Sequence, residues 1–189
     1  MRKLILIKHA KPVVDPDVPS DQWQLGDEGR GRAAKLAVVL KLYALTELVS
    51  STEPKARQTA EAAGEVLGIG VRTAEDLHEH DRSNVPHMDS RDFISAIAQF
   101  FQQPRRLVLG NETAEEAGQR FSDAVDAQME STAADRDVAI VTHGTVISLF
   151  AQRRAKQDPF TLWRRMGLPS LIAFELPAYK VVSLVDRLD

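Results

Sequence analysis

Cysteine is absent from this chain of 189 residues. Its absence excludes disulfides, thiolate nucleophiles and cysteine-ligated metal centres together. Long apolar runs are also missing, since no hydrophobic stretch approaches the roughly 20 residues that a membrane helix needs. Two basic residues near the start, Arg2 and Lys3, precede an apolar run of only four residues, shorter than that of a signal peptide. We therefore expect a cytoplasmic protein that does not associate with a membrane.

An excess of positive charge is lacking as well. Lys and Arg number 24 and Asp and Glu 27, which gives a formal net charge of −3. Nucleic-acid-binding domains usually carry a strong basic excess, so nucleic acid is not an expected partner. Hydrophobic residues make up 43% and charged residues 27%, the balance of an ordinary globular domain. The length suits one core, and we expect a single domain over 1–189, with no indication of its oligomeric state.

Apolar runs typical of buried strands alternate with stretches of helical periodicity. Strands are expected at 4–7, 46–50, 71–73 and 138–142, and helices at 27–42, 54–68, 90–103, 113–131 and 145–154. Two further apolar runs, 170–176 and 181–185, flank a Pro-Ala-Tyr turn and suggest an antiparallel edge. The alternation predicts an α/β fold, a three-layer α/β/α sandwich around a mainly parallel sheet. Within it, we expect 76–131 to form a helical and loop cap over the site.

Two histidines leave apolar runs in matching positions. His9 follows Leu-Ile-Leu-Ile-Lys, and His143 follows Val-Ala-Ile-Val-Thr. Because the carboxyl ends of parallel strands form the edge where open α/β proteins place their sites, the pair predicts a functional site. Either histidine alone could be a hydrogen-bonded core residue. Between them, Arg57 lies in the first turn of a predicted helix. Its planar guanidinium suits phosphate oxygens, although a lone helical arginine is more often a solvated surface residue.

Taken in order, these segments resemble the histidine phosphatase superfamily, also called the phosphoglycerate mutase-like family. The Arg-His-Gly of that family is matched here by Lys8-His9-Ala10, and its second histidine motif by Thr142-His143-Gly144. Its most specific signature is matched by Ser-Ser…Ala-Arg-Gln-Thr-Ala at 50–60. The remaining matches are Leu25, Gly29 and Ala33 in the first predicted helix, Leu77-His78-Glu79, and Gly110, Glu112, Thr113 and Arg120. The resemblance covers most of 3–150.

The resemblance implies a phosphomonoester hydrolase that uses neither a metal nor a cofactor. His9 would be the nucleophile that forms a phosphohistidine, and Glu79 the proton donor. Lys8, Arg57, His143 and Gly144 would bind the phosphoryl group, together with the amides that begin the helix at 145–154. Because Glu79 must be transiently protonated, we expect burial or the phosphate charge to raise its pKa. The expected partner is a small phosphorylated substrate or a phosphoprotein.

Lysine at position 8 departs from the arginine that is usual in the family. It keeps the charge but loses the bidentate geometry of a guanidinium. Lys8 could act as a point-charge clamp, which we favour because the other motif residues are present. Alternatively, Lys11 or Arg82 could supply the missing fork. As a third possibility, the chain could be a phospho-ligand-binding protein with little turnover.

Other members of the family, and one other class of enzyme, remain as alternatives. A phosphoglycerate mutase must keep water from its phosphohistidine, and the short chain shows no obvious lid, which favours a phosphatase. A phosphohistidine protein phosphatase is a lesser alternative. His78, His80, Asp81 and His87 raise the possibility of a metallohydrolase, against the simpler interpretation of a polar loop with solvated histidines. In the run 78–82, a neighbour of Glu79 could also be the acid.

Basic residues gather near the end of the chain: Arg153, Arg154, Lys156, Arg164 and Arg165. They could form a docking patch for an anionic partner. A solvated helix face is the simpler interpretation, given the acidic total.

Overall fold

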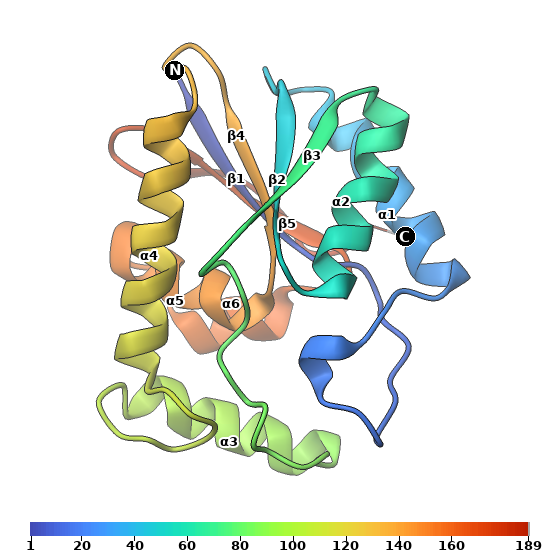
Figure 1. The fold of residues 1–189 in the computed structure, drawn as a ribbon. Helices are drawn as coiled ribbons and strands as arrows, with labels where there is room; N and C mark the ends of the chain where they lie inside the picture. The colour runs from blue at the N-terminus through green and yellow to red at the C-terminus, as the bar shows by residue number, and fades with distance from the viewer. Residues whose placement is uncertain (189) are drawn as a thin grey trace.

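A computed structural model of the protein describes residues 1–188, in which six strands form one sheet (Figure 1). The strands are β1 (Lys3–Lys8), β2 (Glu47–Ser51), β3 (Gly70–Ala74), β4 (Val138–Thr142), β5 (Ser170–Glu175) and β6 (Lys180–Val185). Their order is β3-β2-β4-β1-β5-β6. Strands β1 to β4 run parallel to one another, and β5 pairs antiparallel with β1 on one side and with β6 on the other. The predicted α/β class, with a mainly parallel sheet and an antiparallel edge, is confirmed.

Helices cover both faces of this sheet. They are α1 (Asp27–Leu40), α2 (Pro54–Leu67), α3 (Ser90–Gln102), α4 (Ala114–Ser131), α5 (Gly144–Ala155) and α6 (Pro159–Arg165), with a 3₁₀ turn, η1 (Ser20–Gln22). Helices α1 and α2 lie on one face, α4, α5 and α6 lie on the other, and α3 crosses below the sheet (Figure 1). None of the helices within 1–188 is long and apolar enough to cross a membrane.

The sequence of β1 accounts for the three layers. Successive side chains of a strand point to opposite faces, so a strand between two helical layers must be apolar on both. Leu4 and Leu6 lie in the core cluster that includes Phe121 of α4, and Ile5 lies in the cluster that includes Leu36 of α1. All five side chains are fully buried. The apolar run at 4–7 therefore forms the centre of the sandwich.

The segment 76–131 contributes to two different parts of the molecule. Helix α4 packs on the face of the sheet through Phe121 and Val125. Helix α3 packs through Ile97 and Phe100 in a separate cluster with Leu149 of α5. The part before α4, together with the first turn of α4, therefore lies at the lower end of the sheet, beside the carboxyl ends of β1, β2 and β4 (Figure 1).

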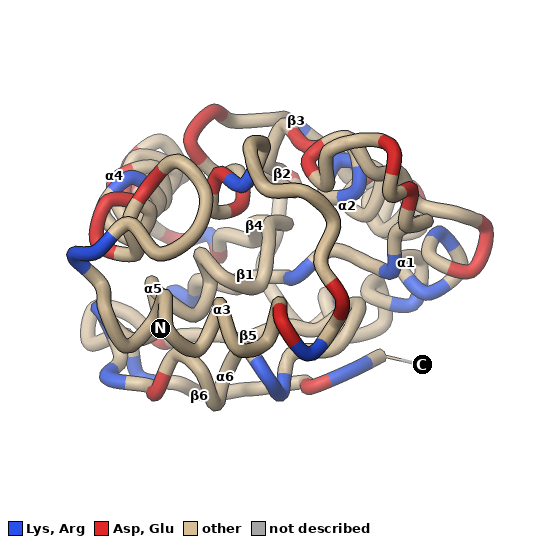
Figure 2. The backbone as a smooth tube through the Cα atoms, turned by 90° about the horizontal axis from the view of Figure 1, so that it is seen from below, with Lys and Arg blue, Asp and Glu red and all other residues tan. Residues whose placement is uncertain are grey.

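Helix α6 is absent from the sequence-based prediction. The sequence does contain residues that favour a helix start there. The Asp158 carboxylate caps the helix by accepting from the Thr161 amide at 2.8 Å, and Pro159 occupies the first turn. The basic residues of this region are interspersed with acidic ones, as the view from below shows (Figure 2). Arg154 pairs with Asp126, and Arg165 with Asp186. This pairing agrees with a solvated helix face.

Candidate active site

The two histidines meet because their strands are neighbours. Lys8 at the end of β1 is paired with Thr142 at the end of β4, so the residues that follow lie side by side. The ring centroids of His9 and His143 are 5.2 Å apart. His9 is 8% exposed and His143 is fully buried. The structure thus brings together the pair that the sequence singled out, at the carboxyl edge of the parallel strands.

The hydrogen bond of His9 sets which ring nitrogen carries its proton. Its Nδ1 lies 2.8 Å from the carbonyl oxygen of Ala10, which can only accept, so Nδ1 is the donor and Nε2 is unprotonated in the neutral ring. Burial, and then the charges of His143 and Lys55, hold the pKa of His9 well below its ordinary value. His9 therefore presents a neutral, nucleophilic Nε2.

His143 has one ring nitrogen engaged and one without a partner. Its Nε2 lies 3.0 Å from Ser51 Oγ and 3.3 Å from Glu53 Oε1. Its Nδ1 is buried and has no hydrogen-bond partner among the residues that the structure describes. Burial and the charge of Lys55 lower the pKa of His143 well below the usual range, although Glu79 opposes them. A buried polar atom without a partner is costly, so a hydrogen bond supplied by a ligand would stabilise this nitrogen.

Lys8 and Gly144 form a second contact between the ends of β1 and β4. Lys8 Nζ donates to the carbonyl of Met166 at 2.8 Å. A Cβ added to Gly144 would lie 3.1 Å from Lys8 Cε, so glycine leaves room for the lysine chain. Burial lowers the pKa of Lys8 to about 8, with Glu79 opposing and Arg82 assisting. Lys8 is thus a cation beside the histidines that loses its charge more easily than an exposed lysine.

The structure places Arg57 outside the site, which corrects the prediction that Arg57 binds the phosphoryl group. Arg57 lies on the outer face of α2, where its side chain is 50% exposed and its Nε is 3.6 Å from Glu61. The cation that this segment directs inward is Lys55, which is buried and whose charge acts on His9 and His143. The sequence could have indicated that Arg57 is exposed. Arg57 and Glu61 form an (i, i+4) charged pair on a helix face that is separate from its buried alanines.

Glu53 is a second residue that the sequence analysis missed. Its buried carboxylate accepts from Lys55 Nζ at 2.5 Å and from the backbone amide of Glu79 at 2.7 Å. Lys55 Nζ also donates to the carbonyl of Ser20 at 2.5 Å. Glu53 therefore links the cation of α2, the His143 ring and the segment that carries Glu79. Nothing in a single glutamate between a strand and a helix marks it as buried.

Glu79 lies in the site, and its carboxylate is bound to the amides at the beginning of α5. Its carboxylate accepts from the amides of Thr145 at 3.2 Å and Val146 at 3.3 Å, so a carboxylate holds the amides that were expected to face the phosphate. Burial raises the pKa of Glu79, but the charges of Arg82 and His143 and the hydrogen bond from the His80 amide together outweigh it, and the net pKa is below the ordinary value. The expected rise is therefore not present in the protein alone.

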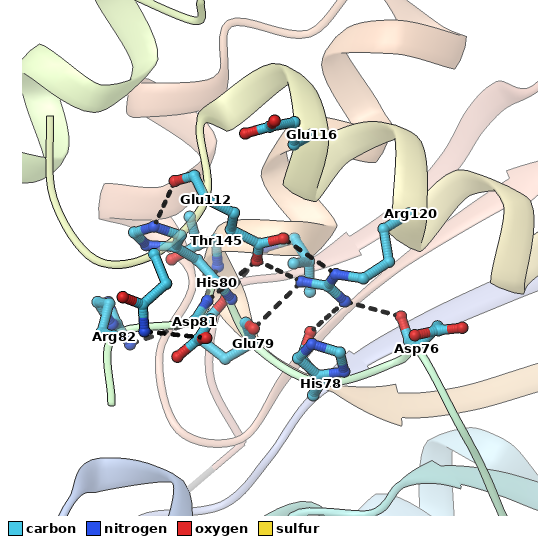
Figure 3. Close-up of polar contacts among 12 residues, drawn as sticks. Asp76, His78, Glu79, His80, Asp81, Arg82, Glu112, Glu116, Arg120 and Thr145 are labelled. Carbon is cyan, nitrogen blue, oxygen red and sulfur yellow. Dashed lines mark hydrogen bonds and ion pairs between the residues drawn. The ribbon is translucent and has the colours of Figure 1, made fainter. Parts of the chain in front are cut away.

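Arg120 and Glu112 hold the segment that carries Glu79 (Figure 3). The guanidinium of Arg120 donates to the carbonyls of Asp76 at 2.8 Å, His78 at 3.1 Å and Glu79 at 3.3 Å. It also donates to Glu112 Oε1 at 2.6 Å, and that carboxylate accepts from the amide of Asp81 at 3.0 Å. The Glu and Arg of the later family motif thus act on the backbone beside the acid.

Gly110 permits this arrangement. Its φ is +77°, a region that side chains disfavour, and an added Cβ would lie 2.1 Å from the carbonyl oxygen of Asp81. The close approach lets the amide of Asn111 donate to that same carbonyl at 2.9 Å. Gly110 therefore packs the loop before α4 directly against the segment 76–82.

The remaining predicted residues divide between the site and the surface. Arg82 lies close to the acid, with Nη2 3.9 Å from Glu79 Oε2, whereas Lys11 forms an exposed ion pair with Glu28. His80 is buried against Phe100, and its Nε2 is 3.1 Å from the carbonyl of Glu112. Within residues 1–188, no group of three or more His, Asp or Glu side chains is arranged to hold a metal ion.

Comparisons with known proteins identify the family and the fold. The family model of the histidine phosphatase superfamily (branch 1) matches residues 4–182, while a comparison with curated proteins finds no match. The solved structure of mycobacterial glucosyl-3-phosphoglycerate phosphatase with inorganic phosphate superposes with a TM-score of 0.76 at 21% identity, covering 100% of this chain and 98% of that one. A variant phosphoserine phosphatase from Entamoeba histolytica with phosphoserine gives 0.77 at 14% identity, covering 98% and 97%. At these identities the likeness establishes a common fold.

Proposed function

Because this chain belongs to the histidine phosphatase superfamily (branch 1), we propose that it hydrolyses phosphomonoesters through a phosphohistidine on His9, without a metal. The observation that carries the proposal is the bond from His9 Nδ1 to the carbonyl of Ala10, which leaves Nε2 unprotonated in a buried site. An unprotonated nitrogen is the form that attacks phosphorus. The low pKa of His9 keeps it in that form at neutral pH.

Three groups would bind the phosphoryl oxygens. Lys8 and Lys55 bring positive charge to the histidine pair, and the unpartnered Nδ1 of His143 offers a position for one oxygen. An arriving phosphate dianion favours protonation of His143, and the carboxylate of Glu53 beside Nε2 supports the resulting imidazolium. Charge spreads over the phosphoryl oxygens in the transition state, so fixed cations there lower the barrier. Both cations are lysines, which act as point charges rather than forks.

Glu79 would serve as acid and then as base. His9 Nε2 attacks phosphorus while the ester P–O bond breaks, and Glu79 gives its proton to the departing alkoxide oxygen. Water then attacks the phosphohistidine, the P–N bond breaks, and Glu79 takes the proton from that water. The first step needs a protonated Glu79. We therefore propose that the negative charge of bound phosphate raises the pKa of Glu79, which lies below its ordinary value in the protein alone.

A phospho-ligand-binding protein with little turnover is the second candidate. It is favoured by the bonds that the lysines already make, from Lys55 to Glu53 and Ser20 and from Lys8 to the carbonyl of Met166. A substrate must compete with these partners. The carboxylate of Glu53 also opposes the charge of a phosphate near His143.

Hydrolysis of an aryl phosphate in the presence of a chelator, from about pH 4 to 8, separates the two candidates. The panel should include 3-phosphoglycerate and a phosphohistidine-bearing protein. We expect turnover by the wild-type protein, an acid-labile phosphoryl label on it after rapid quenching, and loss of both in His9→Ala. Phosphate binding without hydrolysis at any pH would leave the second candidate. Retained activity in His9→Ala would remove His9 as the nucleophile.

A further inference from the structure

A cavity of about 580 Å³ lies between residues 14–23 and 82–93. Two of its lining residues also contact the catalytic groups. Arg82 lies 3.9 Å from Glu79, and the carbonyl of Ser20 accepts from Lys55. These contacts connect the cavity to the side of the site that carries Glu79, the proposed proton donor to the alcohol oxygen, and Lys55. Its volume is within the range of sites for small organic molecules.

The walls of this cavity are mainly apolar. They include Val14, Pro16, Val18, Trp23, Met88 and Phe93. Val14 is 53% exposed and Val18 is 37% exposed, so both valines present carbon surface that the fold does not bury. The indole N–H of Trp23 donates to the carbonyls of Asp15 at 2.9 Å and Val18 at 3.2 Å. Its one polar atom is thus used by its own loop, and the rest of the ring is apolar.

The polar groups on the walls are poorly suited to a sugar or an amino acid. The guanidinium of Arg82 is held between Glu79 and the ring of Phe93, whose centroid is 4.9 Å away. Ser83 Oγ donates to Asp81 at 2.7 Å. The carboxylate of Asp17 would repel an acidic substrate group. Asn84, His87 and Ser90 complete the polar lining. These side chains are too few to pair all the hydroxyls of a sugar, and each unpaired hydroxyl would lose water at a cost.

We propose that this cavity binds the alcohol part of the substrate, and that the substrates are phosphate monoesters of aliphatic or aromatic alcohols. The inference depends on the function proposed above, since it assigns the substrate class of that same site. It distinguishes this chain from the phosphatases of similar fold named for glucosyl-3-phosphoglycerate and phosphoserine. In this chain the phosphate would be fixed by charge, and the alcohol by burial of apolar surface.

A series of linear alkyl phosphates from ethyl to octyl tests the inference, because the leaving groups differ little in reactivity. Each methylene that is buried should raise kcat/KM about fourfold until the cavity is filled. The double variant Val14→Ser/Val18→Ser should lower the ratio of the hexyl to the ethyl value. The matched control is Val13→Ser/Val66→Ser, which changes two exposed valines outside the cavity walls and should leave that ratio as in the wild-type protein.

Binding of the same series to His9→Ala, measured by calorimetry, separates the two proposals. If the wild-type protein hydrolyses no ester but the Kd of His9→Ala falls with chain length, the hydrolase proposal fails and the assignment of the cavity stands. If the esters are hydrolysed but neither Kd nor kcat/KM depends on chain length, the assignment of the cavity is overturned. A higher kcat/KM for phosphoserine or 3-phosphoglycerate than for hexyl phosphate also overturns it.

Discussion

Replacing Lys55 by methionine, with Arg57→Ala as its control, tests the assignment of the phosphate-binding cation. The two residues lie two positions apart on α2, but their side chains point in opposite directions. The side chain of Lys55 is 6% exposed and lies beside Glu53, whereas that of Arg57 is 50% exposed and pairs with Glu61. The two variants therefore remove one positive charge each from the same helix, one inside the site and one outside it.

The expected losses follow from burial. Loss of one fixed group that stabilises transition-state charge typically lowers kcat by about 10² to 10³, and we expect this for Lys55→Met. Removing one partner of a buried ion pair also costs about 3 kcal/mol or more, because Glu53 would remain charged and unpaired. In a chain of this length, that corresponds to a fall in Tm of about 6 to 12 °C. Arg57 points away from the site, so Arg57→Ala should change kcat/KM less than about twofold. Because an exposed pair contributes at most about 1 kcal/mol, its Tm should fall by no more than about 2 to 4 °C.

Steady-state kinetics and thermal unfolding of the same samples keep activity and stability apart. The double variant Glu53→Gln/Lys55→Met removes both charges and should recover most of the lost Tm, since an uncharged pair leaves no isolated carboxylate. Its kcat should stay low, because the cation is still missing. If Arg57→Ala lost activity and Lys55→Met did not, the assignment would be wrong. Recovery of kcat in the double variant would show that Lys55 acts only by neutralising Glu53.

Two further predictions concern Lys8 and Gly110. Burial lowers the pKa of Lys8 to about 8, so Lys8 is charged below that pH and neutral above it. The value of kcat/KM should therefore fall as the pH rises through about 8. Lys8→Arg stays charged and should move that fall to higher pH. An unchanged pH profile in Lys8→Arg would contradict this role. Gly110→Ala should lower the free energy of unfolding in urea by about 1 to 3 kcal/mol, because of its positive φ and the contact with Asp81. Gly31→Ala, within α1 and with open space around it, should instead raise it by about 0.5 to 1 kcal/mol, and equal effects would refute the steric argument.

The fold and the histidine pair could be predicted because both depend on local pattern. An apolar run such as 4–7 needs burial on two faces, and the residue after a parallel strand lies at the edge where sites form. Helix α6 was missed because it has only seven residues, although Asp158 and Pro159 begin it with suitable residues. The match to Leu77-His78-Glu79 pointed to a carboxylate that the structure brings to the amides beginning α5, next to His143.

The direction of side chains on α2 could not be taken from the order of motifs alone. Lys55 and Arg57 are two positions apart, and on a helix two positions are enough to move a side chain from the buried face to the exposed face. The acid is a similar case. Its pKa depends on burial and on the charges of Arg82 and His143, and both the burial and His143 come from distant parts of the chain.

The sequence by itself determined the sandwich, the two histidines at strand ends and the lysine beside the first of them, since these follow from periodicity and position along the chain. Only the tertiary structure decided which cation faces the histidines, that Glu53 joins them, and that an apolar cavity lies between residues 14–23 and 82–93. The physical reason is that burial and charge environment are set by neighbours distant in sequence. A lysine such as Lys55 differs from an exposed one only through what the fold packs around it.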